Sequence, residues 1–280
     1  MKRSIFLLAC AVGLCSCSHK NFSVFDALYY RDKPDLSADG ISRIKLIYEK
    51  FLVTDGELDW EKVDRQVSET VEEGCRTVSI DIESWYSDRT PEEITLRLDS
   101  LFGRFRAADP DIQIGNYGVP VQNLNVLHHV VLERGVAEEE VIPRWEKSSQ
   151  VREPAGSVSD ILLPSLYIYN YDIDQWERDL RTTMERVRTL YPDKKVYIYL
   201  WPQCYDWKTS PYYMQFLSGD QFERLLEAAY SCTDGVILWA SGVESHRDRV
   251  PVFWDDGRVQ DIYAGVQRFL KRHRRHIQIK

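Results

Sequence analysis

Short apolar runs alternate along this chain with longer segments whose apolar residues recur at helical spacing. The strands that this pattern predicts lie at residues 22–30, 43–48, 77–83, 112–120, 160–169, 195–202 and 234–241. The run at 43–48 also fits a helix. Regular alternation of strands and helices favours a parallel sheet whose strands are connected by crossover helices.

Two of the intervening helices begin with a capping box, in which a hydroxyl side chain is followed three residues later by Glu or Gln. Thr90 and Glu93 form one such pair, and Ser218 and Gln221 form the other. Seven strands with helical crossovers predict an α/β fold, a TIM-like barrel of seven or eight strands in a single domain over residues 17–280. Residues 121–157 are less regular and predict an insertion or lid that contains some helix.

Residues 1–16 have the pattern of a secretion signal. Lys2 and Arg3 precede an apolar run at 5–14 that is too short to span a bilayer. The next residues resemble a bacterial lipoprotein cleavage box with Cys17 as the lipidated residue, and an ordinary secretory signal cut nearby is the alternative. We therefore expect a lipid anchor to a membrane and a place in the bacterial cell envelope, on the periplasmic side or the outer surface.

The charge balance argues against nucleic acid as a partner. Residues 1–16 hold two basic and no acidic residues, so that the 36 Lys and Arg fall to 34 against 44 Asp and Glu, a net charge of about −10. The basic segment at 271–276 is a local exception, which we interpret as a solvated helix end.

Neither a metal nor a cofactor is expected from the sequence. Beyond the leader, Cys75, Cys204 and Cys232 are odd in number and match no zinc spacing, and both one disulfide and free thiols are compatible with them. The pair His128-His129 has no companion ligands nearby in the sequence. A glycine-rich phosphate loop is absent from the sequence as well.

Two carboxylates at the end of the strand at 77–83 are the strongest candidates for chemistry. Asp81 and Glu83 are two residues apart, and in a strand such residues point to the same face. Two neighbouring carboxylates in an apolar strand are unfavourable unless they are used, and a structural salt bridge is the plain alternative. Paired carboxylates at the C-terminal end of a barrel strand are typical of general acid chemistry on glycosidic bonds.

Aromatic and polar residues follow the other predicted strands at the same end of the barrel. Any one of these aromatic residues also suits simple packing in a strand, and the acidic ones also suit a loop. Together they predict a rim that stacks on and hydrogen-bonds to a sugar. The candidate substrate-binding residues are Tyr117, Tyr167, Tyr169, Trp201, Tyr205, Asp206 and Trp239.

Three segments resemble the hyaluronidases of glycoside hydrolase family 56 and, more loosely, the family 18 chitinases. The Asp-Ile-Glu of residues 81–83 is similar to an Asp-x-Glu signature, and residues 162–167 are similar to a strand with an active-site tyrosine. Residues 216–239, from Phe-Leu-Ser to Val-Ile-Leu-Trp, match a further segment of that family. Ala240 stands where a glycine usually follows the tryptophan, and the disulfides of the family are not matched.

This resemblance implies a retaining, substrate-assisted cleavage of glycans that contain N-acetylhexosamine. Glu83 would be the acid and base, and the sugar's own 2-acetamido oxygen would be the nucleophile. Asp81 would hold the acetamido N–H and stabilise the developing positive charge. Tyr167 or Tyr205 would bond the acetamido oxygen, and Trp239 would form the floor of the pocket.

Two alternatives remain open from the sequence. In one, the barrel is a glycosidase with a protein nucleophile, Asp206 or Glu244, opposite Glu83. In the other, the chain is a surface lipoprotein that binds a glycan without cleaving it.

Overall fold

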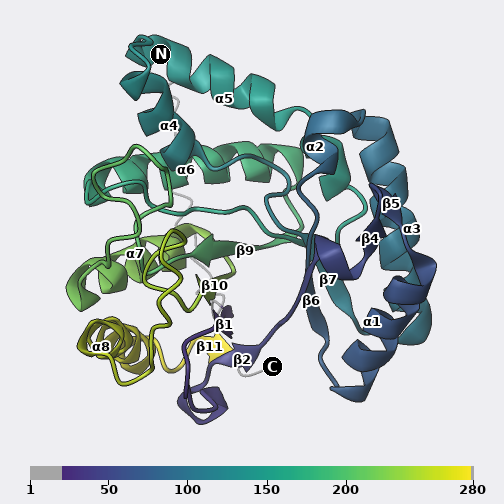
Figure 1. The fold of residues 1–280 in the computed structure, drawn as a ribbon, viewed down its shortest axis with the longest axis horizontal. Helices are drawn as coiled ribbons and strands as arrows, with labels where there is room; N and C mark the ends of the chain where they lie inside the picture. Colours follow the sequence, from purple (N-terminus) through teal and green to yellow (C-terminus); the bar gives the residue numbers. More distant parts are fainter. Residues whose placement is uncertain (1–20, 279–280) are drawn as a thin grey trace, which may run out of the picture.

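The computed structural model describes residues 21–278, so the predicted signal segment and Cys17 lie outside the described residues. Parallel strands form its centre and helices surround them (Figure 1). The central strands are β1 (Phe22–Leu28), β2 (Ser42–Arg43), β3 (Lys45–Tyr48), β6 (Thr77–Asp81), β7 (Gln113–Asn116), β8 (Ile161–Leu162), β9 (Lys195–Leu200) and β10 (Gly235–Ala240).

The central strands close on themselves. Strand β1 pairs in parallel with β10 on one side and with β2 on the other, and β2 continues after one residue into β3. Strands β3, β6 and β7 pair in that order, and a parallel bridge between Tyr117 and Leu163 connects β7 to the β8 segment. Strand β8 pairs with β9, and β9 with β10. With β2 and β3 counted as one strand, a parallel barrel of seven strands results, which confirms the predicted TIM-like barrel.

Short strands outside the barrel complete the sheets. A hairpin of β4 (Val53–Thr54) and β5 (Glu57–Leu58) precedes the first helix. Strand β11 (Ile277–Gln278) pairs with the start of β1. The basic segment at 271–276, expected to be a solvated helix end, therefore runs from the last helix into β11, and His273 contacts Glu227 at 2.8 Å.

Helices follow the strands and cover the outside of the barrel. They are α1 (Trp60–Glu72), α2 (Trp85–Asp88), α3 (Pro91–Ala108), α4 (Leu124–Glu133), α5 (Val141–Ser149), α6 (Ile173–Leu190), α7 (Gly219–Cys232) and α8 (Gly257–Arg272). Both predicted capping boxes are present, at Thr90 on α3 and at Ser218 on α7. None of the helices in residues 21–278 is long and apolar enough to cross a membrane.

The segment 121–157 is more regular than expected. It contains α4 and α5 and two short 3-10 helices, η3 (Glu138–Glu140) and η4 (Glu153–Gly156). The indole of Trp145 is buried and donates to the carbonyl of Gln122 at 2.7 Å. Helix α4 packs against both α5 and α6, so α4 and α5 form a helical layer next to α6.

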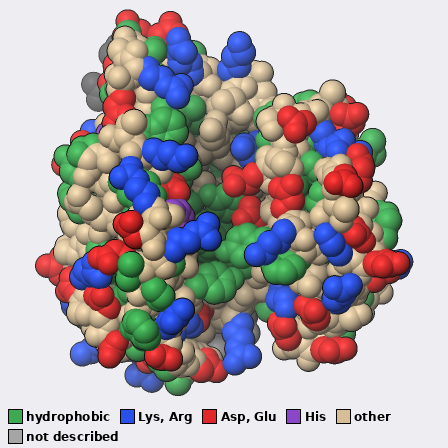
Figure 2. Space-filling view, in the orientation of Figure 1, with side chains coloured by type: hydrophobic (Ala, Val, Ile, Leu, Met, Phe, Trp, Pro, Cys, Tyr) green, Lys and Arg blue, Asp and Glu red, His purple; other side chains and the backbone are tan. Residues whose placement is uncertain are grey.

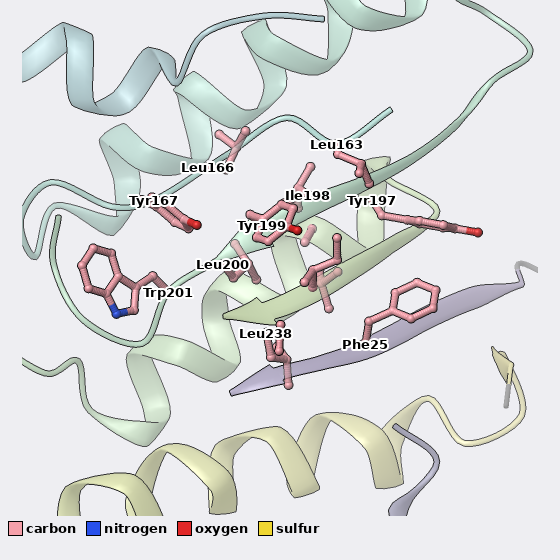
Figure 3. Close-up of a cluster of buried hydrophobic side chains, with 14 of the residues drawn as sticks. Phe25, Leu163, Leu166, Tyr167, Tyr197, Ile198, Tyr199, Leu200, Trp201 and Leu238 are labelled. Atoms are coloured by element: carbon pink, nitrogen blue, oxygen red, sulfur yellow. The ribbon is translucent and has the colours of Figure 1, made fainter. Parts of the chain in front are cut away.

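Charged side chains of both signs are mixed over the face drawn in Figure 2, around a central hollow with a hydrophobic floor. Inside the barrel, side chains form layers. Phe25 of β1 and Tyr197 of β9 pack at 5.0 Å between ring centroids (Figure 3). One layer further along, the hydroxyl of Tyr199 donates to the hydroxyl of Ser79 at 2.6 Å. A Cβ atom at Gly235 would lie 2.4 Å from the carbonyl oxygen of Ser23 and 2.9 Å from the ring of Tyr197, so this position of β10 requires glycine. Cysteines 75, 204 and 232 are not joined to one another by a disulfide.

Candidate active site

Strand β6 places the two carboxylates. Ser79 is fully buried inside the barrel, and Asp81, two residues later, points the same way. Ile80 and Ile82 are also buried, but on the opposite face of the strand, away from the barrel interior. Strand β6 ends at Asp81, and Glu83 follows at the mouth. The carbonyl of Glu83 accepts from the Tyr86 N–H at 3.2 Å, which starts the turn into α2.

Asp81 and Glu83 line one pocket of about 190 Å³ at the C-terminal end of the strands. Figure 2 shows acidic side chains beside a hollow with a hydrophobic floor on this side of the molecule. The pocket is smaller than the roughly 300–1,000 Å³ of sites for drug-sized ligands, so it suits one sugar ring. Its other lining residues are Leu46, Tyr117, Tyr167, Tyr199, Trp201, Tyr205, Asp206, Trp239 and His246.

Tyr167 is at the centre of the aromatic wall. Its ring is stacked with Trp239 at 5.6 Å and with Tyr205 at 6.2 Å between centroids. Trp201 packs edge-on against Trp239 at 4.9 Å and against Tyr167 at 5.5 Å. Interlocked rings of this kind hold one another in place, which gives a preformed apolar surface for the C–H face of a sugar.

The indole N–H of Trp239 is fixed as well. It donates to the hydroxyl of Tyr48, at the end of β3, over 3.2 Å. Tyr117 packs edge-on against Tyr199 at 5.0 Å, deeper in the barrel. Tyr117, Tyr167, Tyr199, Trp201 and Trp239 therefore reach the pocket from four different strand ends.

Burial and like charge act together on the two carboxyl groups. The pKa of Asp81 is raised from 3.8 to about 7, first by burial and then by the charges of Glu83 and Glu49. Burial also raises the pKa of Glu83, and the charges of Glu49 and Asp206 add to this effect. Glu83 remains accessible to solvent at the mouth, but the surrounding wall reduces its hydration. Both groups therefore hold a proton at higher pH than ordinary carboxyl groups.

Arg152 opposes this effect at Glu83, because its positive charge lowers the pKa of that group. The guanidinium lies 3.9 Å from the centroid of the Tyr86 ring, a cation–π contact. Tyr86 in turn accepts from Asn116 at 2.9 Å. Arg152 lies between α5 and η4, so the segment 121–157 supplies a charge to the site.

Of the predicted substrate-binding residues, Tyr169 is not brought into the pocket. Strand β8 ends at Leu162, and the backbone beyond it does not keep the alternation of a strand. The N–H of Tyr169 donates to Asn125 at 2.8 Å, and its hydroxyl donates to Glu133 at 2.5 Å. The prediction for Tyr169 is corrected for this reason: the side chain packs against α4.

Glu244, the other possible nucleophile, lies elsewhere, and so does His128, which the sequence did not predict to bind a metal. Glu244 contacts Arg258 at 2.7 Å and lines a different surface hollow. His128 lies 3.4 Å from Asp179, and within residues 21–278 no three His, Cys, Asp or Glu side chains are arranged to hold a metal ion.

Sequence reasoning missed Leu46, Tyr199 and His246. The sequence did carry a signal for Tyr199: it lies in β9 two residues before Trp201, which directly follows that strand, so the strand alternation predicts that both side chains share one face. His246 had none, because it lies in a loop after β10.

No protein-family model and no curated protein matches the sequence. Among solved structures, bee venom hyaluronidase in complex with a hyaluronic acid tetramer is similar, with a TM-score of 0.54 and 16% identity over 92% of this chain and 99% of that chain. This likeness settles the fold. The chain is a TIM barrel. An endo-1,4-β-D-mannanase from Thermotoga petrophila has a TM-score of 0.48 and 9% identity over 89% of this chain and 99% of that chain.

Proposed function

We propose that this TIM barrel is a glycoside hydrolase that cleaves glycans containing N-acetylhexosamine, with retention and with the substrate's acetamido group as nucleophile. One observation carries the proposal: Asp81 and Glu83 line the same aromatic pocket, and both have raised pKa values. The resemblance of residues 81–83, 162–167 and 216–239 to family 56 hyaluronidases supports the choice of mechanism.

Glu83 is suited to be the acid that protonates the leaving oxygen and then the base that activates water. Its raised pKa keeps the proton available closer to neutral pH, where general acid catalysis is most effective. Glu83 lies at the mouth of the pocket and Asp81 deeper, which supports giving Glu83 the bond to the next sugar and Asp81 the acetamido group.

Asp81 is suited to stabilise the cyclic oxazolinium intermediate. Its ionised form is unfavourable in this pocket, because of burial and of the negative charge of Glu83. When positive charge develops on the acetamido group beside it, the ionised form becomes favourable. Asp81 therefore binds the transition state more strongly than the ground state, which is the requirement for catalysis.

The aromatic residues complete the pocket. Trp239 offers a fixed ring face on which the sugar can stack. Tyr167 and Tyr205 line the same pocket, and their hydroxyls are available to donate a hydrogen bond to the acetamido oxygen. Burial raises the pKa of Tyr205 to about 12, so its hydroxyl remains a donor at neutral pH.

Glu83→Gln tests the proposal directly. The amide keeps the size of the side chain and removes its proton, so turnover of an N-acetylhexosaminide should fall about 10²- to 10⁴-fold while binding persists. Glu244→Gln is the matched control, because this carboxylate lies outside the pocket, and it should keep full turnover. Equal turnover in Glu83→Gln and wild type would refute the role of Glu83. Sugar binding without hydrolysis in both proteins would indicate a glycan-binding lipoprotein.

A second candidate keeps the barrel and uses Asp206 as a protein nucleophile. Asp206 lines the pocket, and its charge raises the pKa of Glu83. A substrate without the 2-acetamido group separates the two mechanisms. Its cleavage at an undiminished rate would favour Asp206, whereas substrate assistance requires that it is not cleaved.

We also propose that the mature chain begins at Cys17 and is held in the bacterial cell envelope by a lipid. The support is the charged start, the short apolar run and the cysteine box of residues 1–17.

A further inference from the structure

His246 lines the pocket together with both carboxylates, and the proposed mechanism does not use it. Its imidazole is stacked on Trp201, with 5.8 Å between the ring centroids and 29° between the planes. The side chain is half-buried, with 37% of its surface accessible to solvent. It therefore forms part of the accessible wall of the pocket.

The backbone around His246 is held by a neighbouring loop. The N–H of His246 donates to the sulfur of Met214 at 3.0 Å. The buried amide of Gln203 donates to the carbonyls of Met214 at 2.9 Å and Glu244 at 3.2 Å, so it connects the loops after β9 and β10. Gln203 also accepts from the indole of Trp201 at 3.1 Å. The stack of His246 on Trp201 is thus built on a fixed frame.

The contact with Asp206 defines the chemistry of the ring. Nδ1 of His246 lies 2.8 Å from Oδ2 of Asp206. An ionised carboxylate only accepts hydrogen bonds, so Nδ1 carries the proton. In the neutral ring Nε2 is then a hydrogen-bond acceptor. Within residues 21–278, Nε2 has no hydrogen-bond partner.

We propose that His246, oriented by Asp206, accepts a hydrogen bond from a hydroxyl group of the sugar in the pocket and so determines which sugar is accepted. The inference rests on the proposed function, since it assumes that a sugar occupies the pocket. It assigns Asp206 to positioning His246, in place of a role as nucleophile. Three carboxylates line this small space, Asp81, Glu83 and Asp206. The sugar they fit is an uncharged N-acetylhexosamine, because a sulfate or uronate group would meet negative charge.

Calorimetric binding of N-acetylglucosamine thiazoline and of its analogues lacking the hydroxyl at C3, C4 or C6 tests the inference. His246→Phe keeps the ring on Trp201 and removes both nitrogens. Wild type should bind one of the three deoxy analogues roughly tenfold more weakly than the parent. His246→Phe should already bind the parent thiazoline about tenfold more weakly than wild type does. Removing the same hydroxyl from the ligand should then cause no further loss of affinity for His246→Phe.

Asp206→Asn tests the positioning role. Its amide can donate to Nδ1 and move the ring proton to Nε2, which turns the acceptor into a donor. That hydroxyl would then have to accept from Nε2–H, so the loss on removing it should differ between Asp206→Asn and wild type, although the fold is kept, as thermal unfolding would show. His273→Phe is the matched control, since His273 lies 2.8 Å from Glu227 in a similar pair on the outside of the barrel. This control should bind all probes as wild type does.

The outcomes separate the two proposals. If wild type does not bind the parent thiazoline, the proposed function and this inference both fail. If wild type binds it and His246→Phe shows the same losses with every deoxy analogue, the inference alone is overturned.

Discussion

Replacing Asp81 by Asn should stabilise the folded protein at neutral and alkaline pH. The pKa of Asp81 is about 7 in the folded chain and near its ordinary value of 3.8 in the unfolded chain. Between these values the folded state binds more protons, so the free energy of unfolding falls as the pH rises through this window. Above about pH 7 the loss of unfolding free energy caused by the ionised Asp81 is complete, and below about pH 4 it is absent.

The size of the effect follows from the difference between the two pKa values. Each pH unit corresponds to about 1.4 kcal/mol, which gives about 4 kcal/mol for the full difference. Water that still reaches the pocket screens part of this, so we expect about 2–4 kcal/mol. Asn cannot ionise and has nearly the shape of a protonated Asp. Above pH 7 the free energy of unfolding of Asp81→Asn should therefore exceed that of wild type by this amount. A carboxylate kept for catalysis thus lowers stability.

Urea unfolding of wild type and Asp81→Asn from pH 4 to pH 8.5 measures the effect. The two curves of unfolding free energy against pH should meet near pH 4 and separate up to about pH 7. Asp88→Asn, which removes an exposed carboxylate on α2, controls for the loss of a charge. If Asp81→Asn is less stable than wild type at pH 8, or if the difference does not depend on pH, Asp81 is not a destabilised carboxylate and the reasoning fails.

Two further predictions concern the charge at Glu83 and the N-terminus. Because Arg152 lowers the pKa of Glu83, Arg152→Gln should raise it and move the alkaline limb of the kcat profile to higher pH. A limb that stays in place or moves to lower pH would contradict the electrostatic role of Arg152. Cys17→Ser should move the protein from the membrane fraction to the soluble fraction and abolish incorporation of labelled palmitate. Membrane retention of this variant would exclude Cys17 as the anchor.

The barrel could be predicted because its local signals agree with the global fold. The capping boxes at Thr90 and Ser218 start α3 and α7, and the inward alternation of β6 leads from Ser79 to Asp81. The same alternation correctly predicts that Trp201 and Trp239, at the ends of β9 and β10, point into the pocket. It fails for Tyr169, since β8 is only two residues long and the backbone near Tyr169 bonds to α4 instead of a strand.

The charges that tune the pocket could not be predicted in this way. Arg152 lies outside any strand, and it reaches the site through the ring of Tyr86, a contact that no spacing in the sequence indicates. His246 reaches the pocket because Asp206 and Trp201 hold its ring, from a loop about 40 residues away. Such contacts depend on the packing of loops, which follows from the whole fold and not from local periodicity.

Calorimetric binding of N-acetylglucosamine thiazoline to wild type and Asp81→Asn is the most direct test of whether the pocket recognises an acetamido group. The thiazoline is a stable mimic of the oxazolinium intermediate, so wild type should bind it tightly. Asp81→Asn should bind it at least about tenfold more weakly, because a charge-assisted hydrogen bond is lost. Equal affinity in the two proteins, or no binding to wild type, would contradict substrate-assisted cleavage by this pocket.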